Sequence, residues 1–261
     1  MITNLRQLDL NLLLVFDALM QEQNLSRAAL RLHRTGDPTL GAAVGSVKSL
    51  QARRFRGTYA DLMASPAFGP AARFFLEELY SDTDYTDRDQ QFGRIAGTLQ
   101  TMFPQPVVNT AVALAVLHAQ TEELDQDMGR AWLAHEGADA ANDAARYTAV
   151  WRAVGQRHAR QQQLESVLAM GTDLARLTRT PGLRMMLRMM RGPANAAGMG
   201  ALQKFLEAGF DTFGQLARQR GGVEQFLATI EQRERALIDL LFDADPVTCG
   251  TQLNHTLGQA R

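Results

Sequence analysis

One expected helix carries side chains that could bind a metal ion. His118 and Glu122 are four residues apart, and Asp125 follows near the same face. Residues at this spacing lie above one another on a helix, so the helix could offer nitrogen and oxygen ligands. A helical di-iron centre needs two Glu-x-x-His helices and two more carboxylates, and His158 and Glu165 do not reproduce that spacing. His118 and Glu122 are therefore weak metal candidates, and a hydrogen-bonded structural histidine is the alternative.

A run of arginines and methionines is the second group with chemical potential. Arg184, Arg188 and Arg191 follow an i, i+4, i+7 pattern that places them on one face of a helix. This face could meet an anionic ligand, an acidic partner or DNA. The methionines between the arginines can fill gaps in a core or line an adaptable groove. The alternative is a row of solvated arginines above a methionine-filled core.

Nucleophilic and cofactor chemistry find no support in the sequence. Cys249, the single cysteine, follows Pro246 in an expected tail, a poor place for a preorganised nucleophile. The chain has no Gly-x-Ser-x-Gly, no phosphate-binding loop and no dinucleotide-binding fingerprint. We predict that the protein is not an enzyme and uses no cofactor.

Composition is typical of a folded globular protein. Of 261 residues, 46% are hydrophobic and 21% charged, which excludes a disordered chain and a coiled-coil rod. A single cysteine excludes an internal disulfide and fits a reducing compartment. No apolar run approaches the roughly 20 residues that a bilayer requires, and the N-terminus does not read as a signal peptide. We expect a cytoplasmic protein with no membrane partner.

The elements that would position these residues all read as helices. Apolar residues recur at helical spacing, and no useful alternation typical of strands occurs. We predict an all-α fold, in which a short N-terminal helix-turn-helix-like segment joins a bundle of about six to seven helices. Residues 244–261 lack periodicity and are expected to form a flexible tail. Expected helices include Thr39–Met63, Asp87–Met102, Val107–Ala134, Arg157–Leu177, Pro181–Met190, Leu202–Ala217 and Val223–Phe242.

The first 33 residues carry the most specific pattern. The stretch Leu5–Leu19 reads LRQLDLNLLLVFDAL, and Asn24–His33 reads NLSRAALRLH. Both resemble the opening of LysR-type transcription regulators, whose first two helices begin a winged helix-turn-helix. Residues 1–60 also hold eight basic and four acidic side chains, a formal charge of +4, while the remainder carries −5. A basic end on an acidic body is typical of an attached nucleic-acid-reading element, although solvated arginines would also produce it.

The resemblance weakens over the third helix. It continues to Leu50 if one residue is inserted in the turn, but Asp37 and two glycines stand where they would weaken DNA contact. Residues 51–59 read as further helix in place of a wing, and the effector domain is missing. The resemblance implies this set of DNA-binding residues: Ser26, Arg27, Thr35, Thr39, Ala42, Ser46 and Lys48. A working shortened helix-turn-helix and a remnant packed on the body both remain open.

A second resemblance covers residues 46–243. The sequence Phe74–Tyr80, FFLEELY, looks like the Phe-Phe-Leu-x-x-Leu-Tyr signature of an uncharacterised family of bacterial all-helical proteins. This resemblance implies a fold and no activity. The two resemblances overlap at residues 46–50, which suggests a fusion joint there.

These observations lead to two functional hypotheses. The first is a DNA-binding transcription regulator, in which residues 1–50 read DNA as a homodimer and residues 46–243 dimerise or sense a partner. The second is a non-enzymatic helical interaction or ligand-binding protein with a vestigial N-terminus that does not bind DNA. The sequence names neither a small-molecule ligand nor a DNA site.

Overall fold

The computed structural model describes residues 37–79, 104–135, 143–196, 198 and 200–260. Within these residues every regular element is a helix, so the predicted all-α fold is confirmed. The described part has eleven helices, more than the six to seven expected. Three of them, α3, α9 and α10, are short pieces of seven residues or fewer, and α13 lies in the expected tail. Their bounds are α2 (Pro38–Thr58), α3 (Ala60–Ala64), α4 (Gly69–Leu79), α6 (Gln105–Ala134), α7 (Asp143–Val154), α8 (Arg157–Thr178), α9 (Leu183–Met189), α10 (Arg191–Ala196), α11 (Gly200–Leu216), α12 (Gly222–Asp243) and α13 (Pro246–Gly258).

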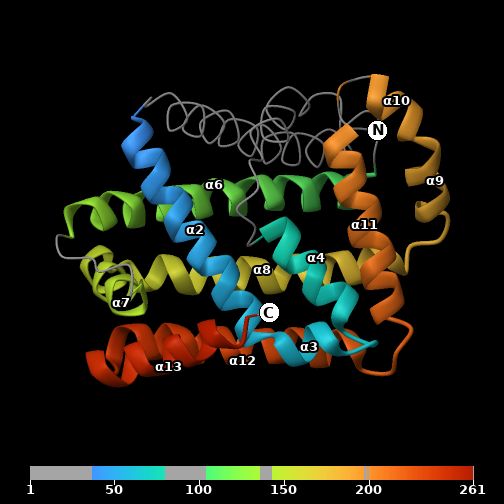
Figure 1. Ribbon diagram of the computed structural model, residues 1–261. Coiled ribbons are helices and arrows are strands. Elements are labelled where there is room, and N and C mark those ends of the chain that lie inside the picture. The colour runs from blue at the N-terminus through green and yellow to red at the C-terminus, as the bar shows by residue number, and fades with distance from the viewer. Residues whose placement is uncertain (1–36, 80–103, 136–142, 197, 199, 261) are drawn as a thin grey trace, which may run out of the picture.

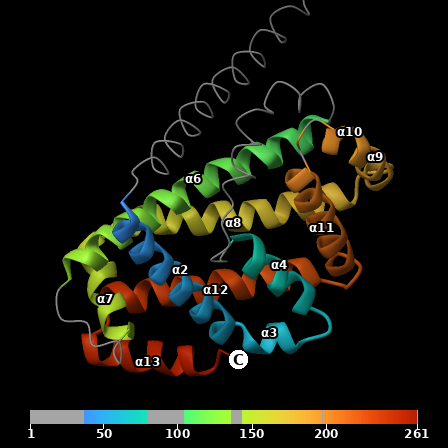
Figure 2. The same ribbon diagram turned by 45° about the horizontal axis from the view of Figure 1, so that its top comes forward.

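Three long helices form the centre of the bundle. Figure 1 shows α8 between α6 and α12, with α2 crossing in front of them. Helices α9, α10 and α11 gather at one end of the molecule, whereas α7 and α13 lie at the other (Figures 1 and 2). Among the described helices, none has the length and hydropathy needed to cross a membrane.

The core consists of two hydrophobic clusters. In the larger, phenylalanines of α4, α11 and α12 pack together, with ring centroids 5.3 Å apart for Phe75 and Phe226 and 5.5 Å apart for Phe74 and Phe205. The smaller joins the first half of α2 to α6, α7 and α13 through Val47, among other residues. Aromatic packing of this kind adds to the free energy gained by burial.

Helix α2 runs without interruption through the proposed fusion joint at residues 46–50. Its start follows from sequence, since the Asp37 side chain accepts a hydrogen bond from the Thr39 amide at 2.9 Å and Pro38 occupies the first turn. The helix expected over residues 39–63 is divided at Tyr59, whose backbone leaves the helical region before α3 begins.

A helix, α13, occupies the region where sequence analysis expected a flexible tail. Asp245 caps it by accepting from the amides of residues 247 and 248, and Leu253 and Leu257 are buried in the smaller core cluster. A capped start followed by apolar residues four apart explains the helix. Cys249 therefore lies in a buried helix and not in a tail.

The close crossing of α2 and α13 depends on Gly57. A methyl group added at Gly57 would lie 1.9 Å from the carbonyl oxygen of Thr256. The glycine lowers helix propensity, but it allows the two backbones to approach. Gly45, earlier on the same helix, has no atom within 4 Å of the corresponding position.

Candidate functional sites

The residues that the LysR resemblance assigns to DNA lie on different sides of α2. Thr39, Ala42 and Ser46 are exposed, and the Ser46 hydroxyl donates to the Ala42 carbonyl at 3.1 Å. The Lys48 side chain turns inward and is only 20% exposed. The other three predicted DNA contacts, Ser26, Arg27 and Thr35, lie outside the described residues.

Lys48 forms an ion pair with Glu122 of α6, one of the two weak metal candidates. The ring nitrogen Nε2 of His118, the other candidate, is 3.9 Å from the same carboxylate oxygen. The structure thus brings His118 and Glu122 together as their spacing predicted, but a lysine ammonium supplies the positive charge beside them. In the described ranges, no group of three or more His, Cys, Asp or Glu side chains is placed to hold a metal ion.

A second layer of buried polar contacts lies one turn further along α2. The Gln51 amide donates to Asp125 Oδ1 at 3.1 Å and to the Tyr147 hydroxyl at 3.4 Å. Asp125 is 2% exposed, and burial raises the pKa of its carboxyl group although the nearby charges of Lys48 and Arg160 oppose that shift. Burial likewise raises the pKa of Tyr147.

The third layer joins α2 to α12. Arg54 forms a buried ion pair with Glu234, with 2.5 Å between Nη1 and Oε1, and the Tyr59 hydroxyl donates to the same oxygen at 2.8 Å. We call the three layers the interior network, which consists of Lys48, Gln51, Arg54, Tyr59, Glu122, Asp125, Tyr147 and Glu234. Because its inward residues are spaced about three apart on α2, one stripe of that helix carries all of its cationic partners.

Two buried donors beside the interior network lack hydrogen-bond partners. Arg160 stacks its guanidinium group 4.3 Å from the centroid of the Trp151 ring. Its Nη2 and the Trp151 indole nitrogen are both buried without a partner. Orphan donors of this kind are commonly satisfied by buried water. Arg160 and Trp151 thus lie beside the interior network and are not members of it.

The interior network has the perturbed groups that functional sites often share, but both of its cations are paired with carboxylates. Lys48 faces Glu122, Arg54 faces Glu234, and Arg160 acts electrostatically on Asp125. We expect these buried pairs to fix the register of the helices that supply them. Sequence reasoning singled out Glu122 and Asp125 near a possible metal site and Lys48 as a DNA contact, and it missed the other five residues. Polar residues at inward positions of α2 were an available signal.

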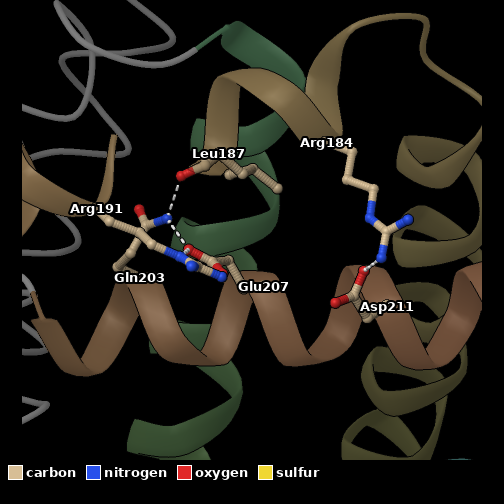
Figure 3. Close-up of polar contacts among 6 residues, drawn as sticks. All are labelled: Arg184, Leu187, Arg191, Gln203, Glu207 and Asp211. Carbon is tan, nitrogen blue, oxygen red and sulfur yellow. Dashed lines mark hydrogen bonds and ion pairs between the residues drawn. The ribbon is translucent and has the colours of Figure 1, made fainter. Parts of the chain in front are cut away.

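Two of the three predicted anion-binding arginines are engaged with α11, as Figure 3 shows. Arg184 forms an ion pair with Asp211 at 2.8 Å, and Arg191 holds the Glu207 carboxylate through its Nε at 2.7 and 2.8 Å. The amide of Gln203 donates to both Glu207 and the Leu187 carbonyl. Arg191 holds the pKa of Glu207 below its ordinary value, and the charge of Arg188 adds to this effect.

The methionines of α9 lie on both of its sides. Met186 and Met190 pack against the larger core cluster, as the core alternative predicted. Met185 and Met189 are 71% and 72% exposed, and the exposed Arg188 lies between them in sequence. For these two methionines the core alternative is wrong.

A depression of about 400 Å³ lies beside α9 and brings together arginines that sequence reasoning missed. Arg179 and Arg218 line it together with Arg184, Thr178 and Thr180. Residues 176–220 hold eight basic and two acidic side chains, a formal charge of +6, so the other residues carry −7. We call residues 176–220 the basic end. A charge count along windows of sequence would have identified it.

One family model matches the chain, over residues 30–248, and its description is "Domain of unknown function (DUF8198)". The match covers most of the sequence. The chain belongs to the DUF8198 family. No curated protein and no solved structure matches it.

The DUF8198 match includes both sites described above. It extends over the interior network and the basic end, and it begins at Leu30, inside the segment that resembles LysR-type regulators. Helix α2 thus lies entirely within the family's domain. The family description states no activity.

Proposed function

We propose that this chain is a non-enzymatic helical interaction protein that binds an acidic partner protein through its basic end. The observation that carries this proposal is the exposure of Met185 and Met189 beside Arg188, within a segment of formal charge +6. Exposed apolar side chains surrounded by charge are a common feature of interaction surfaces.

Electrostatics supports an acidic partner. Eight cations in residues 176–220 face only two acids of the same segment, and those acids are already paired with Arg184 and Arg191. The remaining positive charge would steer an acidic surface toward the basic end and repel basic ones.

The structure of α2 supports placing the function away from the N-terminus. Asp37 caps α2, Lys48 is paired with Glu122, and residues 51–58 continue the helix where a wing would begin. These contacts favour the hypothesis that the LysR-like residues are a remnant.

Binding of fluorescent poly-glutamate to the full chain tests the proposal. We expect binding at low ionic strength that weakens as salt approaches about 0.5 M, because salt screens exposed charges. The triple variant Arg179→Glu, Arg188→Glu, Arg218→Glu should lose this binding. Binding that survives the triple variant, or equal binding of poly-lysine, would refute the proposal.

A second candidate function, the DNA-binding regulator, is favoured by one observation. Thr39, Ala42 and Ser46, three of the residues that the LysR resemblance assigns to DNA, share an exposed stripe of α2 that continues to Arg53 and Arg56. Such a stripe is the part of a recognition helix that enters the major groove. The protein would then bind as a homodimer.

Duplex DNA binding separates this candidate from the first. If α2 reads DNA, Arg27→Ala and Ser46→Glu should weaken salt-dependent binding to genomic fragments, whereas Lys48→Ala should act through stability alone. Sedimentation of the complex would give two chains per site. Failure of the parent chain to bind any fragment removes this candidate and leaves the first untouched.

A further inference from the structure

Helix α9 presents two parallel rows of exposed side chains. Met185 and Met189 form an apolar row, and Arg184 and Arg188 form a basic row one residue before it. Members of each row are four residues apart, which is about 6 Å along the helix axis. Arg184 is already paired with Asp211. A partner that matches these rows therefore needs apolar side chains four residues apart and, beside them, an acidic side chain for Arg188.

The body of the protein fixes these rows in place. Leu183 and Leu187 anchor α9 in the larger core cluster, and the Gln203 amide holds the Leu187 carbonyl (Figure 3). Arg184 near the start of α9 and Arg191 at the start of α10 form ion pairs with acids of α11. The exposed methionines contribute nothing to this anchoring, so the fold does not account for them.

We propose that α9 docks an acidic amphipathic helix of a partner protein. Apolar side chains of that helix would cover Met185 and Met189, and its carboxylates would contact Arg188 and the arginines of the neighbouring depression. This inference rests on the proposed function and specifies the partner's chemistry. Helices dock in this way by laying i, i+4 anchors on an apolar face, and methionine adapts to such anchors.

The positive charges around α9 favour a partner with a negatively charged surface. Arg179 and Arg218 line the depression next to Arg184, so carboxylates that extend past the methionine row meet further cations. Nucleic acid would also meet these charges, but phosphates gain nothing from two exposed methionines. The apolar row therefore favours a protein helix over DNA.

A fluorescence anisotropy titration with defined peptides tests this proposal on the full chain. The probe is a labelled peptide of about 18 residues, long enough to form a helix, with leucines at i, i+4 intervals beside a row of glutamates. A scrambled peptide of equal composition and poly-glutamate provide the comparisons. We expect the amphipathic peptide to bind at least about tenfold more tightly than either.

Substitutions in the two rows then assign the binding to α9. The double variant Met185→Gln, Met189→Gln should weaken binding of the amphipathic peptide about tenfold and leave poly-glutamate binding unchanged. Arg188→Glu should weaken both. Val247→Gln and Arg56→Glu are matched controls, because Val247 is 77% exposed on α13 at the other end of the molecule and Arg56 is exposed on α2 (Figure 1). Thermal unfolding of each variant checks that it is folded.

The outcomes separate this inference from the function on which it rests. Equal binding of the amphipathic and scrambled peptides, with no effect of the methionine substitutions, would overturn the helix-docking inference while the proposed function stands. Absence of binding to every acidic probe would overturn both. Binding of duplex DNA that depends on the same residues, without peptide binding, would also overturn the inference.

Discussion

The interior network and the basic end use the same cationic side chains for opposite purposes. In the network each cation lies beside a carboxylate and away from water, as Arg54 does beside Glu234. The basic end holds eight cations and two acids, and most of the cations are exposed. Arg176 pairs with Asp173 just outside this segment. An arginine that is buried and balanced holds helices together, whereas one that is exposed and in excess is available to a partner.

The largest effect should come from breaking a buried pair. Glu234→Ala removes the buried carboxylate that accepts from both Arg54 and the Tyr59 hydroxyl, so we expect the free energy of unfolding to fall by about 3–5 kcal/mol. Asp61→Ala, which breaks the exposed pair with Arg233, should cost no more than about 1 kcal/mol. Urea unfolding measures both, and equal losses would contradict the division between interior and surface.

The two sides of α2 should respond oppositely to the same substitution. Gly57→Ala forces a methyl group against the Thr256 carbonyl and should destabilise the protein by about 1–3 kcal/mol. Gly45→Ala meets open space and should stabilise it by up to about 1 kcal/mol through helix propensity. Thermal unfolding of the two variants gives the comparison. A stabilising Gly57→Ala would show that α13 does not approach α2 so closely.

The buried carboxyl group of Asp125 and the exposed carboxyl group of Asp61 should make stability depend on pH in opposite directions. Burial raises the pKa of Asp125, so its folded form keeps a proton that the unfolded chain loses. Stability from this group is present below its unfolded pKa, near 3.8, and is lost as pH rises through the folded value. Asp125→Asn should therefore gain stability relative to the parent as pH rises above the unfolded pKa near 3.8. Its amide oxygen can still accept from Gln51.

The stability contributed by Asp61 should change with pH in the opposite direction. Its hydrogen bonds with Arg233 lower its pKa, so its contribution is present above the unfolded pKa and is lost as pH falls. Asp61→Asn should be less stable than the parent near neutral pH and equal to it in acid. Parallel pH profiles for the two asparagine variants, measured by urea unfolding, would contradict the assignment of Asp125 to the interior.

The smallest effect on stability should come from the basic end. Arg188 is exposed on α9, and Arg188→Glu should change the free energy of unfolding by less than about 0.5 kcal/mol. The same variant should strongly reduce binding to an acidic partner. A large loss of stability, measured in urea, would show that the basic end holds the fold together.

Helical periodicity predicted the fold where a helix has one apolar side. Residues 107–134 and 157–177 were predicted as helices and form α6 and α8 to within two residues at each end. Helix α13 was missed because a proline and several polar residues obscure its short apolar stripe. Local sequence defines such elements only when their caps are recognised.

The candidate sites were less predictable because their contacts join distant parts of the chain. Lys48 and Glu122 are 74 residues apart, and Arg54 and Glu234 are 180 apart. No local sequence pattern indicates these pairs. The resemblance to a recognition helix therefore predicted that Lys48 faces DNA, whereas in the structure its side chain is turned inward to Glu122. The arginine row of α9 was predicted from its spacing, but its pairing with α11 required the tertiary structure.

Hydrogen–deuterium exchange of the full chain, with and without poly-glutamate, tests the central claim most directly. We expect bound poly-glutamate to slow exchange in residues 176–220, above all in α9, and to leave α2 unchanged. Slower exchange along the exposed stripe of α2, with none at α9, would contradict the claim that the basic end is the binding surface.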